Sequence, residues 1–211
     1  MKVLILGATG LVGRHALALA LARPEMTAVI APTRRPLPPH AKLTNPIAPQ
    51  LEQLLSDVAH WAADAAICAM GTTIKIAGSQ QAFRAIDHDL QLAFAQATHR
   101  AGTRRFALVS SMGASAGSSV FYARVKGELE RDIRAIGFQS LCIARPFLIG
   151  GHRDEARAAE RIGLTLARVL GPVLPKRFQI DPAPAIAQAL IDAIVAGVPG
   201  CQMRYSASLT G

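Results

Sequence analysis

A strand that runs directly into spaced glycines begins this 211-residue chain. The unbroken apolar run KVLILG (2–7) is typical of a strand buried on both faces of a sheet. It leads into GATGLVG, where Gly7, Gly10 and Gly13 are spaced by three, and then into a helix expected over 10–22. Glycine permits a tight strand-to-helix turn and close packing of the helix on the sheet. The chain therefore opens with a β–turn–α unit.

The same alternation continues and predicts the fold class. Further strand-like runs are TAVIA (27–31), KLTNPI (42–47), DAAICAM (64–70), RRFALVSS (104–111) and QSLCIARP (139–146). Helical periodicity is expected over about 49–60, 79–102, 119–136, 155–170 and 182–196. Apolar strands that alternate with helices predict an α/β protein: a single Rossmann-like, doubly wound parallel sheet with helices on both faces.

The chain length suits one domain over residues 1–211, with a sizeable core. Residues from about 147 to 180 are expected to form a small region that covers the substrate pocket. The charged stretch HRDEARAAER (152–161) fits either a lid or the exposed start of a helix. Lys176 and Arg177 either face an acidic substrate or form a solvated pair.

Composition narrows the function classes. Apolar residues make up 51% of the chain and charged ones 18%, which excludes a wholly disordered protein. The apolar runs are too short to span a membrane, and we expect no membrane partner. Cys68, Cys142 and Cys201 lie far apart, and the histidines are scattered, which indicates free thiols, no metal site and a cytoplasmic location.

The net charge of +9 raises the question of nucleic-acid binding. Basic residues are spread along the chain, and aromatic residues are only 5%, too few for a base-stacking platform. A basic chain attracts polyanions nonspecifically whatever its role. We therefore expect a small-molecule substrate, no specific nucleic-acid partner, and a monomer or homodimer.

The glycine turn is the first candidate site. The amino end of the following helix offers unpaired N–H groups and the positive end of its dipole to phosphates. Because the glycines follow a buried strand and precede a helix, they predict a dinucleotide site. The candidate cofactor-binding residues here are Gly7, Ala8, Thr9, Gly10, Leu11, Val12 and Gly13.

The end of the second strand distinguishes NADP from NAD. An NAD site usually has an acidic residue there, which hydrogen-bonds the adenosine ribose. No Asp or Glu occurs between Glu25 and Glu52, and the strand instead leads to Thr33, Arg34 and Arg35. A guanidinium at this place binds a 2′-phosphate, so NADP(H) is favoured over NAD(H); the alternative is a solvated basic loop.

A second candidate site lies in SSVFYARVKGELE (118–130). Tyr122 and Lys126 are four positions apart, so on a helix they share one face. A lysine ammonium one turn away favours the phenolate of a tyrosine, which gives a proton-transfer pair. The alternative is structural: Tyr122 sits at the edge of the core and Lys126 extends to solvent.

These motifs, taken with FALVSSMGA (106–114) and ARPFLIGG (144–151), resemble the short-chain dehydrogenase/reductase superfamily over residues 2–196. The segment ICAMGTTIKIAGSQQAFRAIDHDL (67–90) is similar to atypical members related to the Tat-interacting, NADPH-binding oxidoreductase-like proteins. Many bacterial relatives in that group have no defined substrate.

The resemblance implies roles for individual residues. Gly71 and Thr72 would approach the adenosine through their backbone, and Pro146 and Phe147 would run past the nicotinamide. Tyr122 would be the acid/base, with Lys126 as its partner and as a cofactor contact. The catalytic serine is either Ser110 or Ser111, and Ser110 is favoured because it precedes Tyr122 by twelve residues.

The resemblance therefore implies an NADP(H)-dependent oxidoreductase that transfers hydride to or from a small carbonyl or alcohol. The alternative is an NADP(H)-binding sensor or scaffold with little turnover. Asp87 stands where many relatives have an Asn that supports a water relay, and its carboxylate either pairs with a basic group or alters that relay. His88 is expected on the helix surface.

Overall fold

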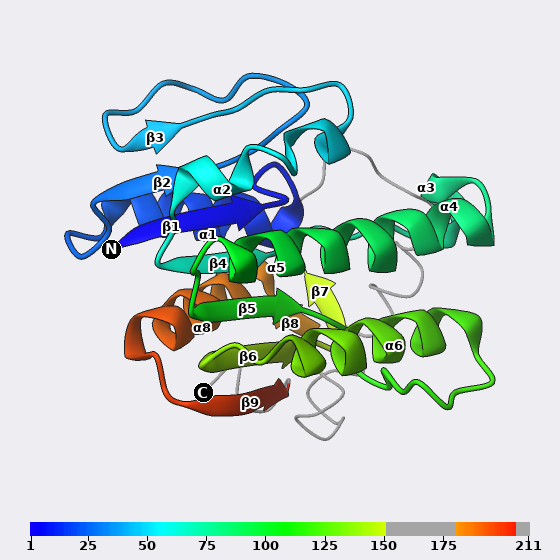
Figure 1. The fold of residues 1–211 in the computed structure, drawn as a ribbon. Helices are drawn as coiled ribbons and strands as arrows, with labels where there is room; N and C mark the ends of the chain where they lie inside the picture. Colours follow the sequence, from blue (N-terminus) through cyan, green and yellow to red (C-terminus); the bar gives the residue numbers. More distant parts are fainter. Residues whose placement is uncertain (151–179, 206–211) are drawn as a thin grey trace.

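A computed structural model describes residues 1–150 and 180–205. Its main sheet has seven strands in the order β3-β2-β1-β4-β5-β6-β9, and every neighbouring pair is parallel (Figure 1). This confirms the predicted doubly wound α/β fold. The strands are β1 (Lys2–Leu6), β2 (Ala28–Ile30), β3 (Leu43–Thr44), β4 (Ala65–Cys68), β5 (Arg105–Val109), β6 (Ser140–Arg145) and β9 (Gly200–Tyr205).

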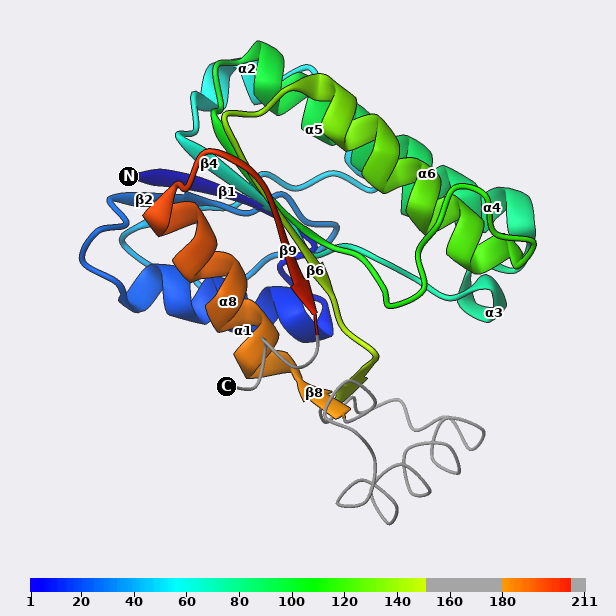
Figure 2. The same cartoon turned by 90° about the horizontal axis from the view of Figure 1, so that it is seen from below.

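Helices cover both faces of this sheet, as Figure 2 shows. Helices α1 (Leu11–Ala22) and α8 (Ala183–Ala196) pack together on one face. The opposite face carries α2 (Val58–Trp61), α5 (Gln91–Arg100) and α6 (Phe121–Ile136). The remaining elements are η1 (Leu51–Leu54), α3 (Ile74–Ala77), α4 (Gln80–Arg84), η2 (Ala85–Leu90), β7 (Leu148–Gly150) and β8 (Ile180–Pro182).

The core consists of two apolar layers, one on each face of the sheet. Successive side chains of a strand point to opposite faces. In β1, Val3 and Ile5 therefore join the layer under α1 and α8, whereas Leu4 and Leu6 join the layer under α5 and α6. Burial on both faces explains why the strands read as continuous apolar runs.

Two predicted helices differ from the structure. The helix expected over 79–102 is interrupted by η2, a π-helical segment between α4 and α5. The helix expected over 49–60 is reduced to η1 and the single turn of α2. Between them Ser56 Oγ contacts the carbonyl of Gln53 at 3.5 Å, a local bond that competes with helix formation.

Two features lay outside the sequence prediction. Strand β9, which pairs with β6 at the edge of the sheet, was not expected. Strands β7 and β8 form a separate parallel pair. Most of the expected pocket region over 147–180, the helix expected over 155–170, and Lys176 and Arg177 lie outside the described residues.

The topology brings the predicted site residues together at the carboxyl ends of the strands. The strand order reverses between β1 and β4, and ligands of such sheets bind beyond the carboxyl ends of the strands at this point. Gly7 follows β1 and Gly71 follows β4. Ser111 follows β5 and Pro146 follows β6, so residues that are distant in sequence meet at the carboxyl ends of neighbouring strands.

Candidate functional site

The glycine turn is built from close backbone contacts. Gly7 has φ +86°, a left-handed conformation that favours glycine, and a Cβ there would lie 2.6 Å from the amide nitrogen of Met70. A Cβ on Gly13 would lie 1.9 Å from the carbonyl oxygen of Gly7. These contacts hold the amino end of α1 against the ends of β1 and β4. Side chains are excluded here for steric reasons.

This turn fits a phosphate-bearing cofactor. Gly10 is the N-cap of α1, and its N–H donates to Gly7 O at 2.8 Å, which closes the turn between β1 and the helix. The first turn contains no acidic residue that would repel an anion. Thr9 is exposed, and Ala8 and Val12 are buried beneath the turn. Free N–H groups and the helix dipole are the features that bind pyrophosphate.

The loop after β2 presents two arginines to solvent. Arg34 and Arg35 are exposed, whereas Thr33 is buried and donates its hydroxyl to Arg35 O at 2.6 Å. Asn45 braces the loop from the β3 side: its amide nitrogen donates to Thr33 Oγ1 at 2.8 Å, and its oxygen accepts from the N–H of Leu37 at 2.8 Å.

Asn45 is not among the cofactor-site residues predicted from the sequence. The sequence carries one weak signal: Asn45 directly precedes Pro46, and an Asn-Pro pair favours the start of a turn. Its amide nitrogen also donates to Ala31 O at 2.6 Å, which ties the loop to the end of β2. The arginine pair therefore projects from a loop with a defined path.

Tyr122 lies in the first turn of α6 and is half-buried. Its ring packs on Phe83 of α4, with the ring centroids 5.4 Å apart. The loop that follows β5 docks against the same helix. The N–H of Ser115 donates to Ala123 O at 3.0 Å, and a Cβ on Gly127 would lie 2.1 Å from the backbone of Ser115. Gly127 thus allows the serine-bearing loop to approach Tyr122.

Lys126 is buried one turn further along α6 and forms an ion pair with Asp87. Lys126 Nζ lies 2.7 Å from Asp87 Oδ1, and Asp87 Oδ2 accepts the N–H of Thr72 at 2.8 Å. Gly71 passes over the pair, since a Cβ there would lie 3.3 Å from Asp87 Oδ1. Of the two alternatives for Asp87, the structure confirms pairing with a basic group. Lys126 does not extend to solvent as the structural alternative required.

Electrostatics at this pair follow from burial and charge. Burial opposes the ammonium form of Lys126, but the nearby Asp87 and Tyr122 outweigh it, and the pKa of Lys126 is raised. Burial raises the pKa of the Asp87 carboxyl, and Lys126 and the Thr72 amide offset only part of that effect. Burial likewise raises the pKa of the Cys68 thiol to about 12.

Ser110 is held by a buried carboxylate. Its hydroxyl is 2.5 Å from Glu130 Oε1, and both side chains are buried. Arg145 binds the same carboxylate through two hydrogen bonds, of 2.8 Å and 2.6 Å, and Arg134 adds a third contact at 3.0 Å. Glu130 and Arg145 were missed by sequence reasoning. The spacing of Glu130 one turn after Lys126 was the only signal.

Ser111 is less buried than Ser110. It is half-buried, and its hydroxyl contacts Met112 O at 3.3 Å. The N–H of Met112 donates to Pro146 O at 2.9 Å, which joins the loop after β5 to the loop after β6. Phe147 is exposed at 40%, and its N–H donates to Asp181 Oδ2 at 2.8 Å.

The expected surface position of His88 is wrong. The imidazole is buried at 6% exposure, with Nδ1 2.8 Å from Asp89 and Nε2 3.0 Å from Asp132 of α6. The π-helical geometry of η2 turns both Asp87 and His88 inward, toward α6. A regular helix pattern read from sequence does not include this extra residue per turn.

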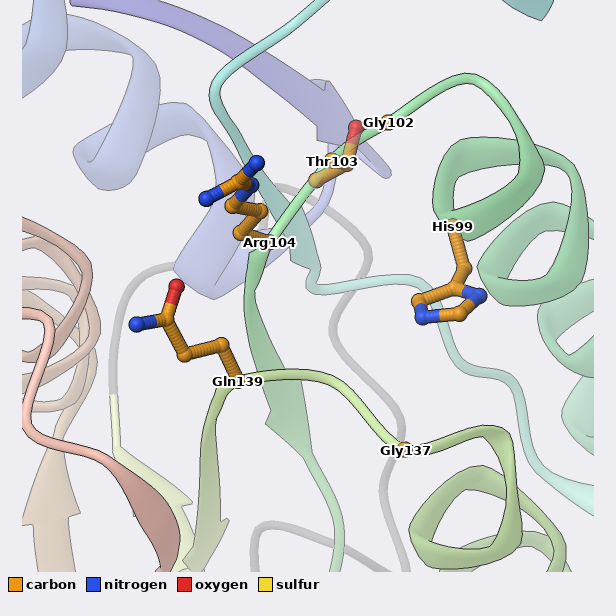
Figure 3. Close-up of a pocket in the computed structure, with 6 residues that line it drawn as sticks. All are labelled: His99, Gly102, Thr103, Arg104, Gly137 and Gln139. Atoms are coloured by element: carbon orange, nitrogen blue, oxygen red, sulfur yellow. The ribbon is translucent and has the colours of Figure 1, made fainter.

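A surface pocket of about 390 Å³ lies at the opposite end of the strands from the predicted site (Figure 3). It lies beside the amino ends of β5 and β6, and none of the predicted site residues contributes to it. Its lining residues are His99, Gly102, Thr103, Arg104, Gly137 and Gln139. The described residues contain no cluster of three His, Cys, Asp or Glu suited to a metal ion. Nor do they include a helix with the length and apolarity needed to cross a membrane.

Comparison with known proteins shows the family to which this chain belongs. A family model described as NAD(P)H-binding matches residues 7–156. The protein named Fmp52, mitochondrial, of Emericella nidulans is 38% identical over 181 residues, or 82% of this chain and 77% of the relative. Its namesake in Aspergillus fumigatus is 35% identical over 210 residues, or 94% and 89%.

Solved structures show the same fold. The Bordetella bronchiseptica enzyme WbmH, solved in complex with NAD+, superposes with a TM-score of 0.73. The superposition covers 97% of this chain and 75% of WbmH at 16% identity. At that identity the likeness shows the fold and says nothing further about chemistry.

The names of the fungal relatives correct one expectation. They are mitochondrial proteins by name, which contradicts the predicted cytoplasmic location. The prediction depended mainly on free cysteines. Unpaired thiols indicate a reducing compartment but do not distinguish one such compartment from another.

Proposed function

Because this chain belongs to the NAD(P)H-binding family within the short-chain dehydrogenase/reductase superfamily, we propose that it is an NADP(H)-dependent oxidoreductase. Its substrate would be a small carbonyl compound or the corresponding alcohol. One observation carries the proposal: Lys126, buried and paired with Asp87, lies one helical turn from Tyr122 at the ligand-binding edge of the sheet.

The glycine turn supports cofactor binding. The N–H groups at the start of α1 would bind the pyrophosphate, and the backbone of Gly71 and Thr72 would border the adenosine half. Pro146 and Phe147, at the end of β6, would border the nicotinamide half. When bound, the nicotinamide supplies or accepts a hydride. The protein's own residues handle the proton and the orientation of the substrate.

Tyr122 would exchange a proton with the substrate oxygen. Its ring is fixed by packing on Phe83, and this packing orients the hydroxyl before substrate binds. Lys126 would stabilise the charge on the tyrosine oxygen and hold the ribose hydroxyls.

We assign the substrate-orienting serine to Ser111 rather than Ser110. The hydroxyl of Ser110 is committed to the buried Glu130 carboxylate, a charge-assisted bond that is costly to break. Ser111 follows directly and is less buried. Ser110 and Glu130 would then hold the backbone from which Ser111 projects.

Selectivity for NADP(H) would come from Arg34 and Arg35. Both are exposed at the end of β2, and the loop that carries them is braced by Asn45. Two guanidinium groups provide donors for a 2′-phosphate, and the acidic residue of an NAD site is missing from this segment.

Binding and turnover measurements test the proposal separately. NADPH is expected to bind at least tenfold more tightly than NADH by fluorescence titration. The double variant Arg34→Ala/Arg35→Ala should lose that difference while its NADH affinity stays the same. Equal affinities in the unaltered protein would refute the NADP(H) assignment.

Turnover is tested with a panel of carbonyl substrates and NADPH. Tyr122→Phe should abolish hydride transfer and leave NADPH binding within about twofold, because it removes only the phenolic hydroxyl and keeps the ring. NADPH binding without turnover across a broad panel would favour the sensor or scaffold alternative.

A further inference from the structure

The segments that follow β4, β5 and β6 meet around the proposed catalytic residues. The segment after β6 is joined to the one after β5, because the N–H of Met112 donates to Pro146 O at 2.9 Å. The segment after β5 in turn docks on α6 one residue beyond Tyr122, where the N–H of Ser115 donates to Ala123 O at 3.0 Å. The three segments comprise residues 69–79, 110–122 and 146–150.

The segment after β4 reaches the same helix. A Cβ on Gly71 would lie 3.8 Å from Lys126 Nζ. The segment continues through α3 into α4, and Phe83 of α4 packs on Phe121 at the start of α6, with the ring centroids 6.0 Å apart (Figure 2). All three segments therefore border the end of α6 that carries Tyr122.

These segments carry almost no charge. Their single charged residue is the exposed Lys75, although Asp, Glu, Lys and Arg make up 18% of the whole chain. The exposed basic pair at the carboxyl ends of the strands, Arg34 and Arg35, lies after β2 instead. Lys126 is paired with Asp87. A charge that leaves water without a partner is costly to bury, so this arrangement disfavours an ionic substrate.

Charged side chains on the neighbouring helices are engaged with the protein itself. Arg84 of α4 forms an ion pair with Glu128 of α6 at 2.5 Å. Arg124, in the first turn of α6, donates to Ser118 O at 3.0 Å, and its guanidinium lies 5.6 Å from the centroid of the Phe121 ring. The two arginines therefore have partners before any substrate arrives.

Each of the three segments exposes one large apolar side chain. Ile76 is 45% exposed, Val120 61% and Phe147 40%. They make up half of the large apolar side chains that the described residues expose. Exposed apolar groups gathered beside a reactive residue are typical of a site for an apolar ligand, because contact with the ligand removes them from water.

We propose that the substrate is an uncharged aldehyde or ketone with an apolar alkyl or aryl body, which contacts Ile76, Val120 and Phe147. This substrate class rests on the proposed function, because it takes Tyr122 as the residue that meets the carbonyl oxygen. Each methylene of the body that is buried should favour binding about two- to fourfold. A carboxylate on the same body would lose water and find only Lys75 on the three segments.

Carboxamides test the substrate class without turnover, since they resemble the carbonyl compound and accept no hydride. In NMR titrations with NADPH present, benzamide should bind about tenfold or more tightly than 4-carbamoylbenzoate. From butanamide to octanamide, affinity should rise about two- to fourfold for each added methylene. Equal or tighter binding of the carboxylate, or affinity that does not depend on chain length, would overturn the proposal.

A change of charge with a matched control locates the site. Val120→Lys should shift the ratio of the two affinities about two- to fivefold toward 4-carbamoylbenzoate, and Ile76→Lys serves if that protein does not fold. Val198→Lys is the control: Val198 is 49% exposed but precedes β9, at the opposite end of the strands. No shift in the first two variants, or an equal shift in the control, would overturn the proposal.

Steady-state kinetics separates this inference from the proposed function. Benzaldehyde should be reduced with a kcat/KM about tenfold or more above that of 4-carboxybenzaldehyde. The reverse order, abolished by Lys75→Ala, would assign an anionic substrate to Lys75 and overturn the inference while the proposed hydride transfer stands. Amide binding in the expected order without any turnover would support the apolar site and count against the proposed function alone.

Discussion

Lys126 Nζ lies 2.7 Å from Asp87 Oδ1 in an interior where the two side chains are only 4% and 0% exposed. The pair joins α6 to the π-helical segment η2, and Gly71 lies close to it. Two charges this deeply buried depend on each other, because removal of one leaves the other uncompensated. Stability and chemistry are therefore coupled at this one contact.

Lys126→Met should lower the free energy of unfolding by about 3–5 kcal/mol in urea denaturation near neutral pH. The double variant Asp87→Asn/Lys126→Met should recover part of that loss, since no lone charge is left behind. The raised pKa of Lys126 sets the pH window. Toward alkaline pH the contribution of the lysine is intact up to about pH 10.5, its ordinary value, and is lost as pH rises through the raised value. Toward acid pH the advantage is lost as the Asp87 carboxylate, whose pKa burial raises, is protonated. A double variant less stable than Lys126→Met would contradict the coupling.

Gly13→Ala should prevent NADPH binding and destabilise the fold. Its Cβ would lie 1.9 Å from Gly7 O, and relief requires α1 to move away from the turn, at a cost of at least about 1–3 kcal/mol. Gly117→Ala is the matched control, because a Cβ there meets nothing within 4 Å. Calorimetry with NADPH separates the two, and equal affinities in both variants would argue against a cofactor site at this turn.

Asn45→Ala should weaken NADPH binding several-fold and leave NADH binding almost unchanged. The substitution removes the bonds that Asn45 makes to Thr33 and Leu37, which hold the loop that carries Arg34 and Arg35. Each such bond contributes about 0.5–1.5 kcal/mol to a defined loop path. Fluorescence titration with both cofactors measures the effect, and an equal loss for NADH would point to general unfolding of the loop.

The two serines should respond in opposite ways. Ser110→Ala removes a hydrogen bond to a buried carboxylate and should cost about 1.5–3 kcal/mol of stability, with turnover largely kept. Ser111→Ala should leave stability within about 0.5 kcal/mol and lower kcat at least tenfold. Urea denaturation and steady-state kinetics on both proteins decide the matter. The reverse pattern would restore Ser110 as the serine that contacts substrate.

Thiol labelling of the native protein should modify Cys201 much faster than the other two cysteines. Cys201 is exposed, whereas burial raises the pKa of Cys68 to about 12 and that of Cys142 to about 11. The thiolate is the reactive form, so these two stay protonated and shielded at pH 8. Mass spectrometry after brief alkylation counts the modified sites, with denatured protein as the control. Rapid labelling of Cys68 would show that the Lys126 region opens in solution.

Much of the architecture follows from local patterns that the sequence displays. The apolar runs of β1, β4, β5 and β6 specify buried strands, and their alternation with amphipathic segments specifies a parallel sheet. The glycine spacing predicted the turn. Close backbone contacts in the structure explain why Gly7 and Gly13 have no side chain. The edge strand β9 escaped prediction because its residues are exposed or half-buried, and the single short alternation from Cys201 to Tyr205 is a weak signal by itself.

The sequence by itself determined the fold class, the glycine turn, and the spacing that puts Tyr122 and Lys126 on one face of α6. Only the tertiary structure decided what each polar side chain meets. It buried Asp87 against Lys126, committed Ser110 to Glu130, and turned His88 inward. Helical and strand periodicities report which face of an element is apolar. The partner of a buried charge comes from a distant segment, and packing of the whole chain is what selects it.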